Sequence, residues 1–440
     1  MTLSVPNVSQ RNYTTSPGFS QKVNLSLQCG FGAAGSDGFV TSPLEPVEQE
    51  KYDKILSSLP AKSVLEFENL RKRGVLTNKK SNDESSTLDN LYKILTTERA
   101  GGLDNTALLA ETIGHLNNPY LISQKSDNSI TNYLEAVFSP KTPFYEKENS
   151  STCTAACIEF DLANQEPAEF ARFVEGLTSP KLEVEKTIDL DNLADKTLDA
   201  IWLLNIFEIP YEESDFNKIK ITLKPDDMAL LKVSLDKKRT NLSKQRNTVD
   251  TLMQSTFMNV GSQQSYNSLT DRRDGNFNVG ERGLIEYEKT FVESVVRNKN
   301  IISVNYQKIN NKGEIAGYEA DFETIKQQLL DTLARKENII AGLTNKTKSG
   351  KLKGHEIVIS DSRTDRHGKT EFLCYNSDME KTSPVVYGEE YLLPRIHHAG
   401  IPKEVVLKTM GFKEGWILGL ENYKKLRAEK IKSGELSPLQ

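Results

Sequence analysis

Apolar residues recur three and four positions apart from about residue 47 to residue 117, in the stretches VEQEKYDKILSSL, SVLEFENLRKRGVL and TLDNLYKILTTE. This spacing predicts amphipathic helices, because residues so spaced share one helical face. A further helix is predicted in the same region, with Asp104 or Asn105 as its N-cap. Residues 1–45 are rich in Ser, Thr, Asn, Gly and Pro. They predict a flexible N-terminal arm, followed by a helical region at 46–145.

The middle of the chain is mainly helical by the same criterion. One helix starts at Cys153 and the next at Pro167, and TLDAIWLLNIFEI predicts an apolar core helix. Residues 217–223, NKIKITL, alternate like a strand. Helices are also predicted over residues 225–260 and in the stretches ITNYLEAVF, LIEYEKTFVESVV and YEADFETIKQQLLDTLARKENIIAGL.

The pattern changes near residue 350. HEIVISDSR and EFLCYNSD each predict a strand, and the turn TDRHGKT between them predicts a β-hairpin. PVVYGEEYLL predicts a third strand, and the Lys-rich C-terminus, including IPKEVVLKTMGFKEGW and ENYKKLRAEKIKSGEL, predicts amphipathic helices. The fold class is therefore α+β, with mainly helical N-terminal and middle parts and a smaller antiparallel β lobe near the C-terminus.

Composition narrows the class of protein. A formal net charge of -5 over 440 residues argues against a general nucleic-acid binder, which needs a basic surface. No apolar run is long enough for a transmembrane helix, and the N-terminus lacks the pattern of a Sec signal peptide. The expected location is cytoplasmic, or outside the cell by a non-Sec route; the Ser/Thr-rich arm would suit such a route, as in a bacterial effector. The four cysteines are read as free thiols.

Cys153 is the first candidate for chemistry. It follows Ser150, Ser151 and Thr152, which are natural N-caps, so it falls in the first turn of the predicted helix. A helix N-terminus favours the thiolate, which is the nucleophilic form of cysteine. Cys157 lies one turn further along and is expected to be a core residue.

A partner for this thiol is found in the C-terminal hairpin. A thiolate nucleophile needs a nearby imidazole, and the imidazole needs a third group to orient it. His355 opens the first strand and Asn376 ends the second, so an antiparallel hairpin places them side by side. The Asn376 amide can accept a hydrogen bond from the ring, and Asp378 is an alternative orienting group.

In these short motifs the chain resembles the papain-like cysteine peptidase superfamily. The order Cys153, His355, Asn376 matches, with the Cys opening a helix and the Asn in the step CYNSD. The resemblance implies a papain-like two-lobe arrangement over 146–440. Cys153 would then lie in a helical lobe, with His355 and Asn376 in a β lobe at about 350–395. The remainder would be a helical insertion at about 225–345 and C-terminal helices.

The oxyanion donor is a point of difference from that superfamily. Its members usually carry a Gln shortly before the Cys, and the run EKENSSTC contains none. Asn149, together with the backbone N–H of Cys153, is therefore the predicted oxyanion donor.

The other histidines are weaker candidates. His115 is expected to be a capping or surface residue, and His367 to be solvated in its turn. His397 and His398, in PRIHHAG, could supply a metal ligand or line a cleft, but surface or packing roles are expected. A zinc site made of Cys153, Cys157 and His397 fits no common zinc module, so no metal and no cofactor is predicted.

Three functions remain open on the sequence alone. The leading hypothesis is a thiol hydrolase that cleaves a peptide or isopeptide bond in a protein or peptide substrate through a Cys-His-Asn triad. The second is a non-catalytic helical interaction protein built on an inactive peptidase scaffold. The third is an acyltransferase or a transglutaminase-like enzyme with the same triad. The distance between the thiol and the His355 ring discriminates the enzymes from the interaction protein.

Overall fold

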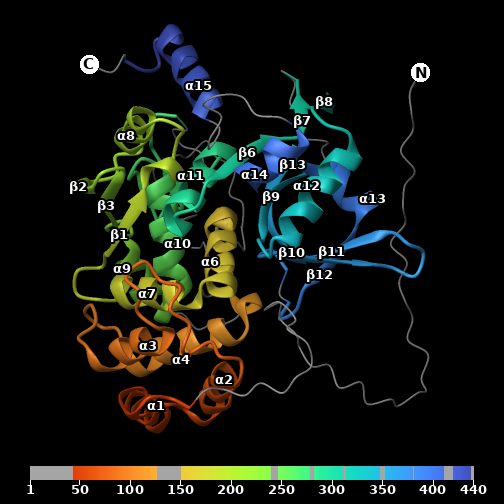
Figure 1. The fold of residues 1–440 in the computed structure, drawn as a ribbon. Coiled ribbons are helices and arrows are strands. Elements are labelled where there is room, and N and C mark those ends of the chain that lie inside the picture. Colours follow the sequence, from red (N-terminus) through yellow and green to blue (C-terminus); the bar gives the residue numbers. More distant parts are fainter. Residues whose placement is uncertain are drawn as a thin grey trace.

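The protein combines a helical part and a sheet part that lie side by side (Figure 1). The computed structural model describes residues 43–125, 150–238, 246–277, 282–310, 314–346, 352–379, 381–410 and 420–437. The mixture of helices with antiparallel sheets confirms the predicted α+β class. Within the described ranges, no helix is both long and apolar enough to cross a membrane.

The first four helices follow the predicted pattern. They are α1 (Pro46–Ser58), α2 (Ala61–Lys72), α3 (Thr87–Thr96) and α4 (Asn105–Asn117). Asp104 is the N-cap of α4, because its side chain accepts a hydrogen bond of 2.7 Å from the backbone N–H of Ala107. A short 3-10 helix, η1 (Pro119–Leu121), follows α4.

Two long buried helices form the centre of the helical part. They are α6 (Cys153–Gln165) and α10 (Thr248–Gly261), and every residue of α10 is buried. Around them pack α7 (Pro167–Leu177) and α11 (Glu286–Arg297). The elements completing this part are α8 (Thr197–Ile206), α9 (Ala229–Lys237), α15 (Leu420–Ser433), η2 (Leu190–Asn192), and the strands β1 (Val184–Asp189), β2 (Tyr211–Asp215), β3 (Lys218–Leu223), β4 (Tyr266–Asn267) and β5 (Arg272–Arg273).

The sheet part is a six-stranded antiparallel sheet in the order β12-β11-β10-β9-β13-β6. Its strands are β6 (Ile301–Asn305), β9 (Ile339–Lys346), β10 (Leu352–Thr364), β11 (Thr370–Tyr375), β12 (Val385–Gly388) and β13 (Ile396–Pro402). Further elements nearby are α12 (Phe322–Ala334), α13 (Glu389–Leu392), η4 (Leu393–Arg395), α14 (Lys403–Thr409), β7 (Gln307–Ile309) and β8 (Ile315–Tyr318).

Helices cover both faces of this sheet. Ile357 and Ile359 of β10 belong to a core shared with α12 and α14, whereas Val358 belongs to the larger core shared with α6. This alternation is the period of two that a strand imposes on its side chains. The sheet is therefore buried on both sides, and α6 lies directly against β10.

The sheet uses more of the chain than the sequence predicts. β6, β9 and β13 lie outside the predicted β region of about 350–395, and the helix predicted up to Leu343 ends at Ala334. A strand that is buried on both faces reads as a continuous apolar run, which periodicity does not separate from a buried helix. The predicted short helix at 130–138 and most of the predicted arm at 1–45 lie outside the described residues.

Candidate active site

The segment that precedes Cys153 is held by one buried carboxylate. Asp271 accepts hydrogen bonds of 2.8 Å from both the Ser150 hydroxyl and the backbone N–H of Ser151, and it also accepts one of 3.0 Å from the Tyr266 hydroxyl. The chain then enters α6 with Cys153 as its first helical residue. The position of the thiol at the helix N-terminus is thus fixed by contacts with a distant loop.

Thr152 is the N-cap residue of α6, as predicted, but its hydroxyl does not cap the helix. It donates a hydrogen bond of 2.7 Å to Oε1 of Gln254 on α10 instead. The first N–H groups of an α-helix have no partner within the helix. The positive end of the α6 dipole therefore lies at the partly exposed Cys153 thiol.

His355 and Asn376 meet as the hairpin predicts. β10 and β11 pair antiparallel, and Nε2 of His355 lies 2.8 Å from Oδ1 of Asn376. The same Oδ1 accepts a hydrogen bond of 3.0 Å from the backbone N–H of Asp378, and the amide nitrogen donates one of 2.9 Å to the Tyr387 hydroxyl. Because Oδ1 can only accept, Nε2 of His355 carries a proton and donates it.

The Cys153 side chain is close enough to the His355 ring to act on its charge, and Nδ1 of the ring lies 3.4 Å from Oδ2 of Asp378. Burial alone lowers the pKa of His355, but the interaction with the Cys153 side chain outweighs it. Together with smaller contributions from Asp378 and Asn376, this interaction raises the pKa to about 9. An imidazolium paired with a thiolate is the form that these contacts stabilise.

Gln124 completes the group of polar side chains, and the sequence pattern did not identify it. Its backbone C=O accepts a hydrogen bond of 3.0 Å from the N–H of Ser150, three residues before Cys153. Its buried side-chain amide donates to Oδ1 of Asp378, next to the His355 ring. Asn149, the predicted oxyanion donor, lies outside the described residues.

Aromatic contacts fix α6 against the strand pair that carries His355 and Asn376. The rings of Phe160 on α6 and Tyr375 on β11 stack with centroids 4.3 Å apart. The Tyr375 hydroxyl donates a hydrogen bond of 2.9 Å to the backbone C=O of Ile122, two residues before Gln124. These contacts join the helix of the thiol, the segment of the amide and the hairpin of the imidazole.

For the remaining candidate residues, the structure confirms the predictions for Cys157, Cys374 and His367 but not the prediction for His115. Cys157 and Cys374 are fully buried, as expected of core residues, and burial raises the pKa of both thiols. His367 is exposed, as expected. The prediction for His115 was wrong. Its ring is buried at the end of α4 beside Asn247, and burial lowers its pKa to about 4.

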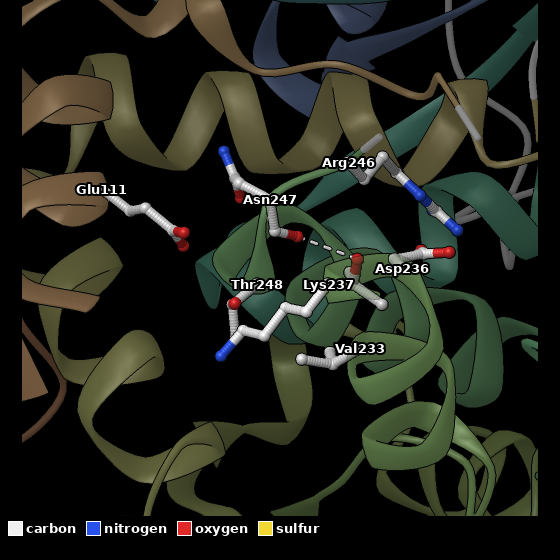
Figure 2. A pocket seen from close by; sticks show the side chains of 8 residues that line it. Glu111, Val233, Asp236, Lys237, Arg246, Asn247 and Thr248 are labelled. Carbon is white, nitrogen blue, oxygen red and sulfur yellow. Dashed lines mark hydrogen bonds between the residues drawn. The ribbon is translucent and has the colours of Figure 1, made fainter. Parts of the chain in front are cut away.

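A pocket of about 260 Å³ lies elsewhere, between α4, α9 and α10 (Figure 2). It is lined by Glu111, Val233, Asp236, Lys237, Arg246, Asn247, Thr248 and Thr251. Neither Cys153 nor His355 contributes to it, and Arg246 links it indirectly to the thiol through a 3.1 Å hydrogen bond to the hydroxyl of Thr152, the residue before Cys153.

Two groups of side chains in the described part of the chain have the composition of a metal site. One consists of Glu286, His397 and His398, and the other of His115, Glu159 and Asp250. Neither group contains a cysteine. The zinc site of Cys153, Cys157 and His397 that the sequence left as a remote alternative is thus not among the metal-capable groups of the described residues.

The arrangement as a whole brings together a thiol at a helix N-terminus, an imidazole that is oriented by an amide, and a second amide beside them. Such a group can form a nucleophilic thiolate and move a proton to and from it. No protein-family model, curated protein or solved structure matches the chain.

Proposed function

We propose that this protein is a thiol hydrolase that cleaves a peptide or isopeptide bond, with a papain-like arrangement of a helical lobe against a β lobe. The observation that carries the proposal is the position of the His355 ring, which lies 2.8 Å from Oδ1 of Asn376 and interacts with the Cys153 side chain. The alternative of a non-catalytic interaction protein predicts a thiol remote from the ring, so this contact argues against it.

In the first half of the reaction, the Cys153 thiolate attacks the carbonyl carbon and the π electrons move to the carbonyl oxygen. The His355 imidazolium then gives a proton to the amine nitrogen, the C–N bond breaks, and a thioester remains on Cys153. In the second half, a water molecule gives a proton to His355 and its oxygen attacks the thioester. The C–S bond breaks, the acid leaves and the thiolate is restored.

Asn376 has a positioning role in this scheme. Its oxygen holds the Nε2 proton, which leaves Nδ1 as the nitrogen that exchanges a proton with Cys153 or with substrate. Because Tyr387 and the Asp378 backbone fix the amide in turn, the ring does not need to reorganise during the reaction.

The oxyanion is assigned to two donors. The backbone N–H of Cys153 has no intrahelical partner, since it opens α6. Gln124 is the second donor, because its amide carries two N–H bonds and the structure uses one for Asp378. The Gln that the papain-like resemblance requires is then supplied by position 124, rather than by the residues that directly precede the cysteine.

The first test is the rate of iodoacetamide labelling at each cysteine against pH, read by mass spectrometry. In the wild type, Cys153 should react as a thiolate well below the ordinary thiol pKa of about 8.5, and His355→Ala should remove that behaviour. His367→Ala is the matched control, because this histidine is exposed and remote from the thiol. A Cys153 that reacts like an ordinary thiol in all three proteins would contradict the proposal.

The second test is turnover of a library of fluorogenic peptides and isopeptides. Cys153→Ala should abolish cleavage with the fold intact by circular dichroism. Gln124→Ala should retain rapid alkylation but lose about 100- to 1,000-fold in kcat, the cost of removing one oxyanion donor. Cleavage that persists in Cys153→Ala would exclude this residue as the nucleophile.

A further inference from the structure

The strand β13 contains a bulge at its histidine pair. The pairing of β13 with β9 shifts register between Ile396 and His398. In a regular strand, adjacent side chains point to opposite faces, whereas a bulge can re-aim one of them. Here Nδ1 of His397 lies 2.9 Å from Nδ1 of His398, so two neighbouring imidazoles present the same ring atom to one point.

Gly342 makes room for this pair. It lies opposite both His398 of β13 and Glu356 of β10, so these two side chains meet over it. A Cβ at position 342 would lie 2.2 Å from Cε1 of His398 and 2.7 Å from Oε1 of Glu356. The His398 ring can therefore occupy its place only because this strand position has no side chain.

Glu356 fixes the orientation of the His398 ring. Its Oε1 lies 3.1 Å from Nε2 of His398, and Lys289 lies 3.6 Å from its other oxygen. The Lys289 ammonium and the His398 ring lie against its two oxygens, and a nearby positive charge stabilises the ionised carboxylate. A carboxylate beside Nε2 favours a proton on that nitrogen, which makes Nδ1 of His398 an acceptor. In the structure this Nδ1 lies at hydrogen-bond distance from Nδ1 of His397, and a metal ion would take the place of that hydrogen bond.

Glu286 supplies a third ligand atom. It is the first residue of α11, and one of its carboxylate oxygens lies within 4.8 Å of the ligand atoms of His397 and His398, as those atoms do of each other. His398 is buried, whereas Glu286 and His397 are partly exposed, so an ion has a route from solvent.

We propose that Glu286, His397 and His398 bind a divalent transition-metal ion of the Zn²⁺ type, with Glu356 as the outer carboxylate that orients His398. Two imidazoles and one carboxylate are a common zinc ligand set, and they leave a fourth position for water. With Zn–N bonds of about 2.0–2.1 Å, the 2.9 Å separation of the two Nδ1 atoms corresponds to an N–Zn–N angle of roughly 90°. A widening of a few tenths of an ångström gives tetrahedral geometry.

The second metal-capable group, His115, Glu159 and Asp250, is a weaker site. All three side chains are almost completely buried. Nε2 of His115 lies 2.9 Å from the Asn247 amide, and Oδ2 of Asp250 accepts a hydrogen bond of 3.0 Å from the backbone of Ser123. The titration described next therefore includes a variant of this group, His115→Gln, as the alternative location of the ion.

The test is isothermal titration of the chelator-treated full chain with Zn²⁺, repeated with Co²⁺ to follow its visible absorption. The wild type should bind one equivalent, and so should His367→Ala and Cys153→Ala. His397→Ala and Glu286→Gln should each lose binding, and Glu356→Gln should weaken it by about 10- to 100-fold. His397 and Glu286 are partly exposed, so these two variants should keep the fold, which thermal unfolding without metal checks.

Four results would overturn the metal site. They are an absence of binding in the wild type, unchanged binding in both His397→Ala and Glu286→Gln, loss of binding in Cys153→Ala, and loss of binding in His115→Gln with retention in His397→Ala. The third would place the ion on the thiol and the fourth in the buried group. Alkylation of Cys153 is measured separately in the metal-free protein, so the two proposals fail independently.

Discussion

The hydrogen bond between Asn376 and His355 gives a prediction whose size follows from the geometry. Asn376→Ala removes the acceptor that lies 2.8 Å from Nε2 of His355, in a place where Asn376 is only 9% exposed. The Nε2–H group is then left without its partner in a buried ring. Because the imidazolium needs that hydrogen bond more than the neutral ring does, the substitution disfavours the charged form.

The size of this pKa shift follows from the strength of the lost hydrogen bond in the charged and neutral forms of the ring. A hydrogen bond to a charged group contributes about 1.5–3 kcal/mol and one between neutral groups about 0.5–1.5 kcal/mol, and only the difference of about 1–1.5 kcal/mol enters the pKa. Each pH unit of pKa corresponds to about 1.4 kcal/mol, so the pKa of His355, which is about 9 in the intact site, should fall by about one pH unit. The equilibrium between the thiolate–imidazolium pair and the neutral pair should move toward the neutral pair by about 10-fold.

Two measurements check this. NMR of the His355 ring against pH should follow the pKa directly, and iodoacetamide labelling of Cys153 at neutral pH should slow. Asn376→Asp keeps an oxygen at the same place and should restore both. Asn338→Ala is a matched control, since it also deletes a buried amide, but one that donates to Asp161 and not to His355.

The reasoning fails if the pKa of His355 stays near its wild-type value in Asn376→Ala while the fold is intact. It fails equally if Asn338→Ala slows the labelling as much as Asn376→Ala does, because the effect would then be a general loss of stability. A purely structural role for Asn376 predicts this second result, so the control separates the two.

Three further predictions concern stability, each read from urea unfolding. Burial raises the pKa of Glu159 to about 7, so the folded state holds a proton that the unfolded chain releases above about pH 4.5. The free energy of unfolding should therefore fall by up to about 3 kcal/mol as the pH rises from about 4.5 to about 7 and then level off, and this fall should be absent in Glu159→Gln; an equal slope in both proteins would contradict the assignment. Asp271→Ala should lower the free energy of unfolding by about 2–4 kcal/mol, because three donors lose their acceptor. Asp271→Asn keeps one side-chain oxygen and should lower it by less; an equal loss in the two variants would argue against a role for these hydrogen bonds. Gly342→Ala should lower the free energy of unfolding by about 1–3 kcal/mol, because its Cβ would clash with the buried His398 ring. Gly317→Ala has no atom within 4 Å of the added Cβ and should be nearly neutral. Similar effects of the two substitutions would contradict the close approach of His398 to Gly342.

Local patterns in the sequence were sufficient for the hairpin and for the position of the thiol. His355 and Asn376 are 21 residues apart in one β-hairpin, so strand periodicity and a turn are enough to predict their contact. Cys153 follows a run of N-capping residues, which predicts the first turn of α6. Both are short-range features of the sequence, so they locate candidate catalytic residues without any knowledge of the long-range packing.

Long-range contacts were not predictable in this way. Gln124 is 29 residues before Cys153, and its hydrogen bonds with the backbone of Ser150 and the side chain of Asp378 bring it to the site. His115 looked like a residue at a helix end, because nothing in its own helix reports that Asn247 lies against it. Asp271 occupies a polar loop, and no local pattern connects that loop with α6. Each of these residues is positioned by a partner that is distant in sequence.

Strand β10 connects the two proposed sites, because His355 belongs to one and its neighbour Glu356 to the other. The carboxylate of Glu356 interacts electrostatically with both His398 and His355. A divalent ion held by His398 adds positive charge next to that carboxylate, which weakens the negative field that Glu356 exerts on the imidazolium of His355. Metal occupancy should then lower the pKa of His355 and with it the share of reactive thiolate at neutral pH. The same strand can in this way make the thiol chemistry sensitive to the metal, without any ligand shared between the two sites.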